Sequence, residues 1–176
     1  MCDMTAIMKI AKKYKLYVLE DCAQCFFAKD EKNRIAGTIG HVGSWSFENS
    51  KHLTTGDGGI VSTNSSKLAQ KMREFSCAGF RNVTASSGKV RIDRNKFQDP
   101  NWKRHNSLAY NYRMPEVAAA IGLAQVERIS FFLSKRIQMG NRFRRIIRKR
   151  NSDILINQHI PIKFKHSYYT FPCLFN

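Results

Sequence analysis

A helix followed directly by a short apolar strand, near the amino terminus, constrains the fold of this chain most. Asp3 suits the N-cap of an amphipathic helix over residues 4–14, whose apolar side chains recur on one face. Residues 16–19 (Leu-Tyr-Val-Leu) then predict a short buried strand. Because a helix, a tight turn and a buried strand make up half of an α/β unit, the sequence predicts an α/β fold with a mostly parallel sheet.

The rest of the chain continues this alternation of strands and helices. Further strands are expected at residues 44–47, 58–63 and 168–175. Helices are expected at 67–75, behind a cap at Asn64–Ser65, at 115–127 starting with Pro115, and at 128–150. Residues 77–109 are polar with little periodicity and predict an extended loop, which in a domain of this size is often functional.

Two polar blocks follow predicted strands and contain residues suited to one cofactor. In the first, Asp21 lies just past the apolar strand, and in the second, Lys51 lies in a polar loop that ends at Gly56–Gly59. An enzyme that holds pyridoxal phosphate needs a carboxylate to pair with the ring nitrogen and a lysine amine to bond the aldehyde as a Schiff base. The two blocks therefore predict a pyridoxal phosphate site.

Composition leaves few alternatives to this interpretation. Cys22 and Cys25 match a C-x-x-C pattern, so redox or metal chemistry is a minor alternative, but no second pair completes a zinc site and no metal is expected. The five scattered cysteines do not predict a disulfide framework. The sequence has no apolar run long enough to span a bilayer and no signal-peptide pattern, so a cytoplasmic location without membrane partners is expected.

The net charge of +17 (30 Lys and Arg against 13 Asp and Glu) favours polyanionic partners. The charge is most concentrated in residues 128–152, which contain many basic residues and no acidic one. A solvated helix face is the favoured explanation. A nucleic-acid-binding module built on residues 128–150 is the less favoured one, because no nucleic-acid-binding motif accompanies it.

Four ordered blocks also carry a family resemblance. They are residues 18–24 (Val-Leu-Glu-Asp-Cys-Ala-Gln), 40–59, 110–125 and 166–169 (His-Ser-Tyr-Tyr). Together they resemble the sugar aminotransferases of the DegT/DnrJ/EryC1/StrS type, which share the aspartate aminotransferase fold. The second and third blocks are long and ordered, and the four blocks span nearly the whole chain.

The resemblance implies the central part of a fold type I, pyridoxal phosphate-dependent transferase. Residues 1–127 would form part of the cofactor-binding large domain, and residues 128–176 a long linking helix and the start of the small C-terminal domain. Family members are considerably longer, and their amino-terminal part supplies a phosphate-binding turn and an aromatic residue stacked on the ring. The chain is therefore expected to be a central fragment, which would leave sheet edges and apolar faces uncovered.

The resemblance also implies roles at matching positions. Lys51 would be the Schiff-base lysine and would shuttle a proton during catalysis. Asp21, as a buried carboxylate, would keep the ring nitrogen protonated, and Gln24 would face the ring hydroxyl. Ser46 would bind the phosphate, and Asn111 would reach a phosphate across a dimer interface.

The residues next to these positions are expected to be structural. Related dehydratases use the same cofactor but have histidine in place of the lysine. Here Lys51 matches the lysine and His52 merely follows it, which favours aminotransfer over dehydration. His52 and Arg113 are expected to support the site rather than to act in it.

The function implied is transamination of a keto sugar, expected to be nucleotide-linked, with glutamate or glutamine as amino donor. The pathway class would be biosynthesis of sugars for cell-surface polysaccharides or secondary metabolites, and the complete protein would be a homodimer. The alternative is a catalytically inactive remnant of such an enzyme.

Overall fold

The structure is a computed structural model that describes residues 1–81, 94–150 and 154–176. The contacts divide the chain into two units, residues 1–62 with 116–176, and residues 63–115. The predicted domain boundary at residue 127 is a different division of the chain and stays a prediction.

The first helix, α1, spans Met4–Lys13 and begins as expected. The side chain of Asp3 accepts a hydrogen bond from the backbone N–H of Ala6 at 3.0 Å, which satisfies one of the free donors of the first turn. At the other end, Lys15 adopts a left-handed φ of 55°, and the N–H of Leu16 donates to the carbonyl of Ala11. This is the Schellman arrangement, which closes a helix by satisfying its last carbonyls.

The first strand therefore starts later than predicted. Because Leu16 completes the end of α1, the strand β1 covers Leu19–Asp21 rather than residues 16–19. Leu16 and Tyr17, expected to be buried, are 56% and 77% exposed. The apolar run that predicted the strand is thus divided between the helix end and a short connection.

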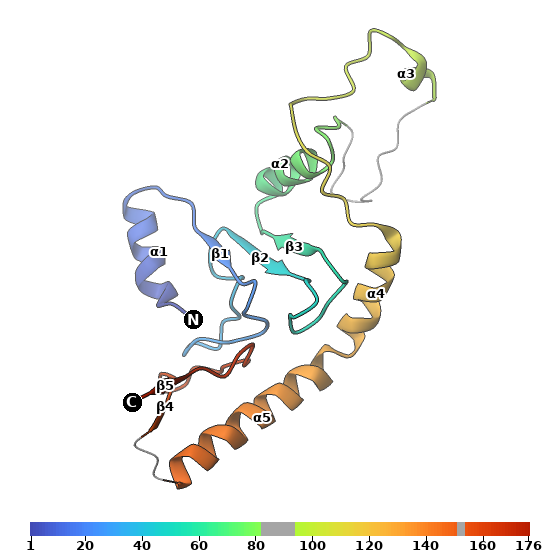
Figure 1. Cartoon of the computed structure of the whole chain (residues 1–176). Helices are drawn as coiled ribbons and strands as arrows, with labels where there is room; N and C mark the ends of the chain where they lie inside the picture. Colours follow the sequence, from blue (N-terminus) through green and yellow to red (C-terminus); the bar gives the residue numbers. More distant parts are fainter. Residues whose placement is uncertain (82–93, 151–153) are drawn as a thin grey trace. The chain divides into compact units, whose positions relative to one another are not determined.

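Three strands form a mixed sheet in the order β1-β2-β3 (Figure 1). β2 spans Val42–Ser46 and runs parallel to β1, whereas β3 spans Gly59–Ser62 and runs antiparallel to β2. The expectation of a mostly parallel sheet is therefore wrong for this part of the fold. After β2 the chain turns back through residues 47–58 and enters β3 at the edge where β2 ends, which makes the two strands antiparallel. A parallel β3 would require a connection that crosses to the opposite edge of the sheet.

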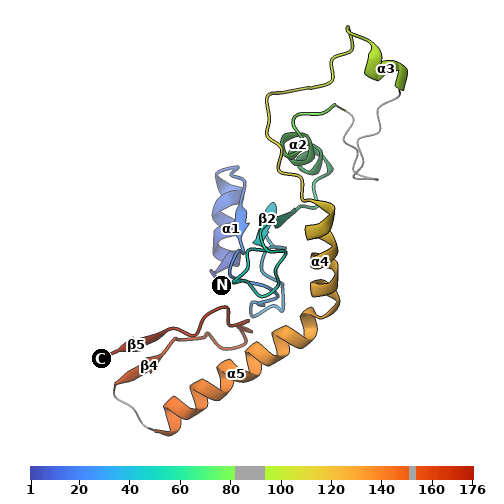
Figure 2. The ribbon, with the colours of Figure 1, turned by 45° about the vertical axis from the view of Figure 1, so that its right-hand side comes forward.

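The same unit contains two consecutive helices and a second sheet. α4 spans Glu116–Glu127 and α5 spans Ile129–Lys149, with a bend of 60° between them. β4, Leu155–Asn157, pairs antiparallel with β5, Cys173–Phe175, and β4 contacts α5 (Figure 2). β4 was not predicted, and the strand expected at residues 168–175 is confined to its last part.

Among the described residues, no single helix is long and apolar enough to cross a membrane. The bent pair α4 and α5 meets the criterion only when both are taken together, by length and composition.

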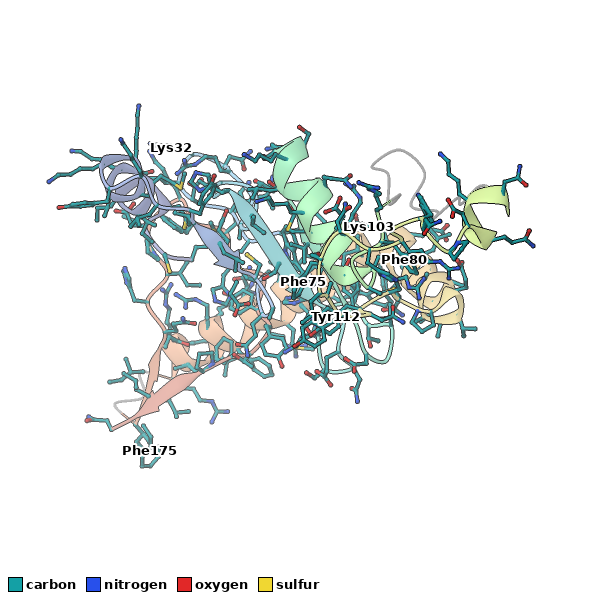
Figure 3. All side chains as sticks on the ribbon, turned by 90° about the horizontal axis from the view of Figure 1, so that it is seen from above. Lys32, Phe75, Phe80, Lys103, Tyr112 and Phe175 are labelled. Carbon is teal, nitrogen blue, oxygen red and sulfur yellow. The ribbon has the colours of Figure 1, made fainter. Side chains whose placement is uncertain are left out.

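The unit of residues 63–115 is built on α2, Ser66–Ser76, whose N-cap Ser65 accepts from the N–H of Leu68 at 3.3 Å, as predicted. An aromatic cluster at the end of this helix is formed by Phe75, Tyr110 and Tyr112. Figure 3 labels two of its members, Phe75 and Tyr112. The extended loop expected at 77–109 contains the short helix α3, Arg94–Gln98, and residues 82–93 lie outside the described residues.

Candidate active site

The parallel pair β1 and β2 brings two predicted site residues to one edge of the sheet. Parallel strands end at the same edge, and in open α/β sheets ligands bind outside those carboxyl ends. Asp21 is the last residue of β1 and Ser46 the last residue of β2. The ladder continues past Asp21, because the N–H of Cys22 donates to the carbonyl of Ser44 at 2.8 Å. Both side chains are thus fixed at the edge where the loop carrying Lys51 begins.

The two adjacent carboxylates of β1 have different surroundings. Glu20 is buried and accepts hydrogen bonds from the backbone N–H groups of Gly37 and Ile39, at 2.8 and 2.7 Å, and of Gly40. Asp21 is exposed, and its Oδ1 accepts from the N–H of Ala23 at 3.0 Å. Glu20 is therefore committed to holding the fold, while Asp21 is the carboxylate that can meet a ligand.

Exposure of Asp21 differs from the sequence interpretation, which assumed a buried carboxylate. β1 alternates exposed, buried, exposed, so burial of Glu20 places Asp21 on the open face. A planar ring bound against this edge would itself have to cover the carboxylate and remove water from it.

Gln24 and Ser46 present polar groups near the same edge. Gln24 is exposed in a turn that is closed by a hydrogen bond from the N–H of Cys25 to the carbonyl of Cys22 at 2.9 Å. The Oγ of Ser46 accepts from the N–H of Glu48 at 3.2 Å. Because this contact uses the oxygen as an acceptor, the hydroxyl proton of Ser46 is available to an anion.

Lys51 lies in the loop of residues 47–58, called the Lys51 loop below. The ends of the loop are joined by hydrogen bonds from the N–H of Phe47 to the carbonyl of Gly58 and from the N–H of Thr55 to the carbonyl of Phe47. The side chain of Lys51 is half-buried, with its Nζ 4.8 Å from the centroid of the Tyr169 ring. In the described part of the chain it forms no ion pair. The amine is thus placed by an aromatic face, a contact that sequence reasoning missed.

His52 anchors the Lys51 loop to the segment before β5. Its side chain is buried, its Nε2 lies 3.0 Å from the carbonyl oxygen of Ser167, and its ring contacts those of Phe26 and Tyr169. Burial lowers the pKa of His52 below its ordinary value, which favours the neutral ring. A neutral Nε2–H that donates to a carbonyl is a structural arrangement, as expected for this residue.

Asn111 belongs to the other unit, residues 63–115. Its side chain is exposed, and its Oδ1 accepts from the Nε of Arg113 at 2.8 Å. Arg113 therefore orients the amide of Asn111, which agrees with a supporting part for the arginine. The part predicted for Asn111 involves a second chain and stays a prediction.

The alternative of redox chemistry at the C-x-x-C pair is disfavoured by the surroundings of the thiols. Burial, followed by the charges of Cys25 and Glu20, raises the pKa of Cys22 to about 12, and burial also raises the pKa of Cys25. The thiolate is the reactive form, and a high pKa keeps it scarce. Within residues 1–81, 94–150 and 154–176, no cluster of three or more His, Cys, Asp or Glu side chains could hold a metal ion.

The residues at this edge fit the chemical groups of pyridoxal phosphate. Lys51 offers a primary amine for the aldehyde, Asp21 an exposed carboxylate for the ring nitrogen, and Ser46 a free hydroxyl proton for the phosphate. In the described residues only Oδ1 of Asp21 is engaged, which leaves Oδ2 open to a protonated ring nitrogen.

Comparison with known proteins shows which proteins this chain is similar to. A GDP-perosamine synthase from Escherichia coli O157:H7 is 34% identical over 158 residues, which is 90% of this chain and 37% of that protein. The structure of an aminotransferase from Psychrobacter cryohalolentis is 31% identical, with a TM-score of 0.79 over 96% of this chain and 42% of that chain. The chain thus spans less than half the length of the relatives it matches.

A more distant structure carries the cofactor. It is an E. coli GDP-4-keto-6-deoxy-D-mannose-3-dehydratase with bound hydrated PLP, 22% identical with a TM-score of 0.79, and the match covers 99% of this chain and 44% of that one. At that identity the likeness shows the fold alone. The model of the DegT/DnrJ/EryC1/StrS aminotransferase family matches residues 1–176, and this chain belongs to that family.

Proposed function

We propose that this chain carries the central part of the cofactor site of a pyridoxal phosphate-dependent enzyme that transfers an amino group to a keto sugar. The observation that supports this most is the common edge of β1 and β2, where Asp21 and Ser46 end their strands and the Lys51 loop begins. A carboxylate and a hydroxyl at one sheet edge, with a half-buried amine in the loop that begins there, are the groups this cofactor needs.

Each residue acts on a different part of the reaction. The bound cofactor supplies an electron-withdrawing ring that stabilises negative charge at the carbon bearing the amino group. Asp21 would hold a proton on the ring nitrogen through charge pairing. Ser46 and Gln24 would orient the cofactor through its phosphate and its ring hydroxyl. Lys51 would hold the cofactor through its amine, and the freed amine would act as the base that moves the proton.

The substrate class rests on the relatives. The E. coli relative is named for a GDP-linked sugar, GDP-perosamine, which supports a nucleotide-linked keto sugar as the acceptor here. Glutamate or glutamine would donate the amino group. The complete enzyme would be a homodimer in which Asn111 contacts the cofactor phosphate of the partner, and its pathway would build sugars for surface polysaccharides or secondary metabolites.

Aminotransfer is favoured over dehydration by the identity of residue 51. A dehydratase of this type needs a histidine base at the lysine position, and here the base is the amine of Lys51, whereas His52 is turned into the core and bonded to Ser167. The primary amine of Lys51 can form a Schiff base with the cofactor, whereas a histidine at position 51 could not.

The test is the formation of a covalent cofactor complex. We would add pyridoxal phosphate to the pure chain and record the visible absorbance of its lysine-bound form, in the wild type, in Lys51→Ala and in Lys67→Ala as a control for an exposed surface lysine. The proposal predicts the absorbance in the wild type and in Lys67→Ala and its loss in Lys51→Ala. A folded wild type without this absorbance is the result expected of an inactive remnant, and would contradict the proposal for this chain.

A further inference from the structure

We propose that Tyr169 is a positioning residue for Lys51, which holds the lysine amine over the face of its ring in the orientation needed to bond the cofactor. This inference rests on the proposed function and adds to it a residue to which the sequence interpretation gave no part. Tyr169 lies in a segment more than a hundred residues beyond Lys51, and only the fold brings them together.

The contact is specific in geometry. The Nζ of Lys51 lies 4.8 Å from the centroid of the Tyr169 ring, within the range of a cation–π interaction. The Tyr169 hydroxyl lies 2.9 Å from the Oγ of Ser50, and Ser50 in turn donates to the carboxylate of Glu48. The aromatic face and its hydroxyl are therefore both tied to residues of the Lys51 loop itself.

The backbone around Tyr169 is fixed from two other elements. Arg136, on α5, donates to the carbonyl oxygen of Tyr169 at 3.3 Å. The buried ring of His52 is bonded to the carbonyl of Ser167, two residues earlier. The segment carrying Tyr169 is thus held both by the long helix and by the residue next to Lys51, so its ring has little freedom to move away from the lysine.

The residue before Tyr169 has a strained backbone conformation. Tyr168 has a left-handed φ of 51°, which is unfavourable for a bulky side chain. Its ring packs on Gly140 of α5, where an added Cβ would lie 2.5 Å from the ring, and its hydroxyl donates to Asn141 at 3.0 Å. Strain of this kind persists only where surrounding contacts enforce it and often marks a functional position. This backbone conformation points the two consecutive tyrosines in different directions, so that Tyr168 packs on α5 and Tyr169 contacts Lys51.

The chemical consequence concerns bond formation rather than cofactor affinity. A lysine side chain has four rotatable bonds, and its amine must approach the aldehyde carbon in a suitable orientation. The ammonium form first gives its proton to water, the neutral amine adds to the carbon, and the C=N bond forms as the aldehyde oxygen leaves as water. A lysine held against a fixed ring samples fewer orientations, which shortens the search of its amine for the aldehyde. Loss of the ring should therefore slow covalent bonding and leave non-covalent binding of the cofactor unchanged.

The experiment measures these two quantities separately. The rate of covalent bonding is followed by stopped-flow absorbance after mixing with pyridoxal phosphate. Non-covalent affinity is measured with pyridoxamine phosphate, which has no aldehyde and cannot bond a lysine. We expect Tyr169→Leu to slow bonding about tenfold, the scale of a cation–π contact of one to two kcal/mol, with unchanged affinity for pyridoxamine phosphate.

Two further variants separate positioning from folding. Tyr169→Phe keeps the ring and should restore most of the wild-type rate. Tyr14→Leu removes a matched lysine–tyrosine pair, because the Nζ of Lys13 lies 5.0 Å from the centroid of the Tyr14 ring at the end of α1, and should change neither quantity. Bonding at the wild-type rate in Tyr169→Leu would overturn the inference. So would a parallel loss of pyridoxamine phosphate affinity and thermal stability, which indicates a merely structural residue.

The outcome also distinguishes this inference from the proposed function. If Lys51→Ala abolishes bonding while Tyr169→Leu has no effect, the cofactor proposal stands and the positioning inference fails. If the wild type forms no Lys51-dependent bond at all, both are overturned.

Discussion

Two loops flank β2, and they are stabilised in different ways. The loop before it, residues 37–40, is held by one buried carboxylate, because Glu20 accepts hydrogen bonds from the N–H groups of three of its four residues. The Lys51 loop after it is held by short polar contacts at Ser46 and Glu48 and by packing against His52 and Tyr169. The first loop has three backbone N–H groups satisfied by one buried carboxylate, whereas the second presents the amine of Lys51, which forms no ion pair in the described part of the chain.

The same separation between a structural and a ligand-facing role is found within one strand, β1. Glu20 and Asp21 are neighbours with the same functional group, and the alternation of a strand points one into the core and the other to the surface. The sequence alone shows two carboxylates after an apolar run. The register of β1 decides which of them holds the fold and which can meet a ligand.

The largest effect is expected on the free energy of unfolding when one glycine in each loop is replaced by alanine. Gly37 and Gly56 have nearly the same left-handed φ, 86° and 85°, but a Cβ on Gly37 would overlap the Trp45 ring, whereas a Cβ on Gly56 would meet nothing within 4 Å. We expect Gly37→Ala to lower the free energy of unfolding by about 3 kcal/mol or more, and Gly56→Ala by about 1 kcal/mol, from backbone strain alone. Urea unfolding measures both. Equal losses would mean that the first loop is no more tightly packed than the second.

The next effect compares the two neighbouring carboxylates. Glu20→Gln replaces one acceptor oxygen by a donor that faces backbone N–H groups, and should cost about 2–3 kcal/mol of unfolding free energy. Asp21→Asn should change stability by less than about 0.5 kcal/mol, because its side chain is exposed, but should weaken pyridoxal phosphate binding. Urea unfolding and cofactor titration of both variants check this. A stability loss in Asp21→Asn as large as that in Glu20→Gln would contradict the division of roles.

A smaller effect depends on pH and concerns the anchor of the Lys51 loop. Burial lowers the folded-state pKa of His52, so the unfolded chain binds the proton more readily than the folded chain. Stability from this residue is therefore fully present above the ordinary histidine pKa of about 6.5 and is lost as the pH falls from there toward the folded-state value.

The variant His52→Gln removes this titration while an amide N–H can still reach the carbonyl of Ser167. We expect wild-type stability to fall more than that of His52→Gln between about pH 7 and pH 5. His166, whose pKa is also lowered by burial, is present in both proteins and cancels in the comparison. Thermal unfolding at each pH gives the difference, and parallel pH profiles would show that folding does not change the pKa of His52.

Local signals in the sequence predicted much of the fold. The caps at Asp3 and Ser65 fixed the starts of α1 and α2, because a helix start depends on neighbouring residues. β4 was missed because three residues carry no periodicity, and its existence depends on pairing with β5. The antiparallel direction of β3 was missed for a similar reason, since it depends on where the loop returns and not on the residues in the strand.

The candidate site was also predictable only in part, because some of its contacts join residues that are far apart in the sequence. Asp21, Ser46 and Lys51 lie close to strand ends, so strand prediction and the family resemblance led to them. Tyr169 was not assigned a part, because Ser50 and Tyr169 are 119 positions apart and no local pattern indicates their contact. The division between Glu20 and Asp21 likewise required the register of β1.

The central claim, that Lys51 is the residue that bonds the cofactor, is tested most directly by locating the bond. Wild-type chain is incubated with pyridoxal phosphate, the bond is fixed by borohydride reduction, and the digested protein is mapped by mass spectrometry. We expect to find the cofactor mass on the peptide containing Lys51 at cofactor concentrations where Lys67 and the other exposed lysines remain unlabelled. Label spread evenly over the surface lysines, with Lys51 no more modified than the rest, would contradict it.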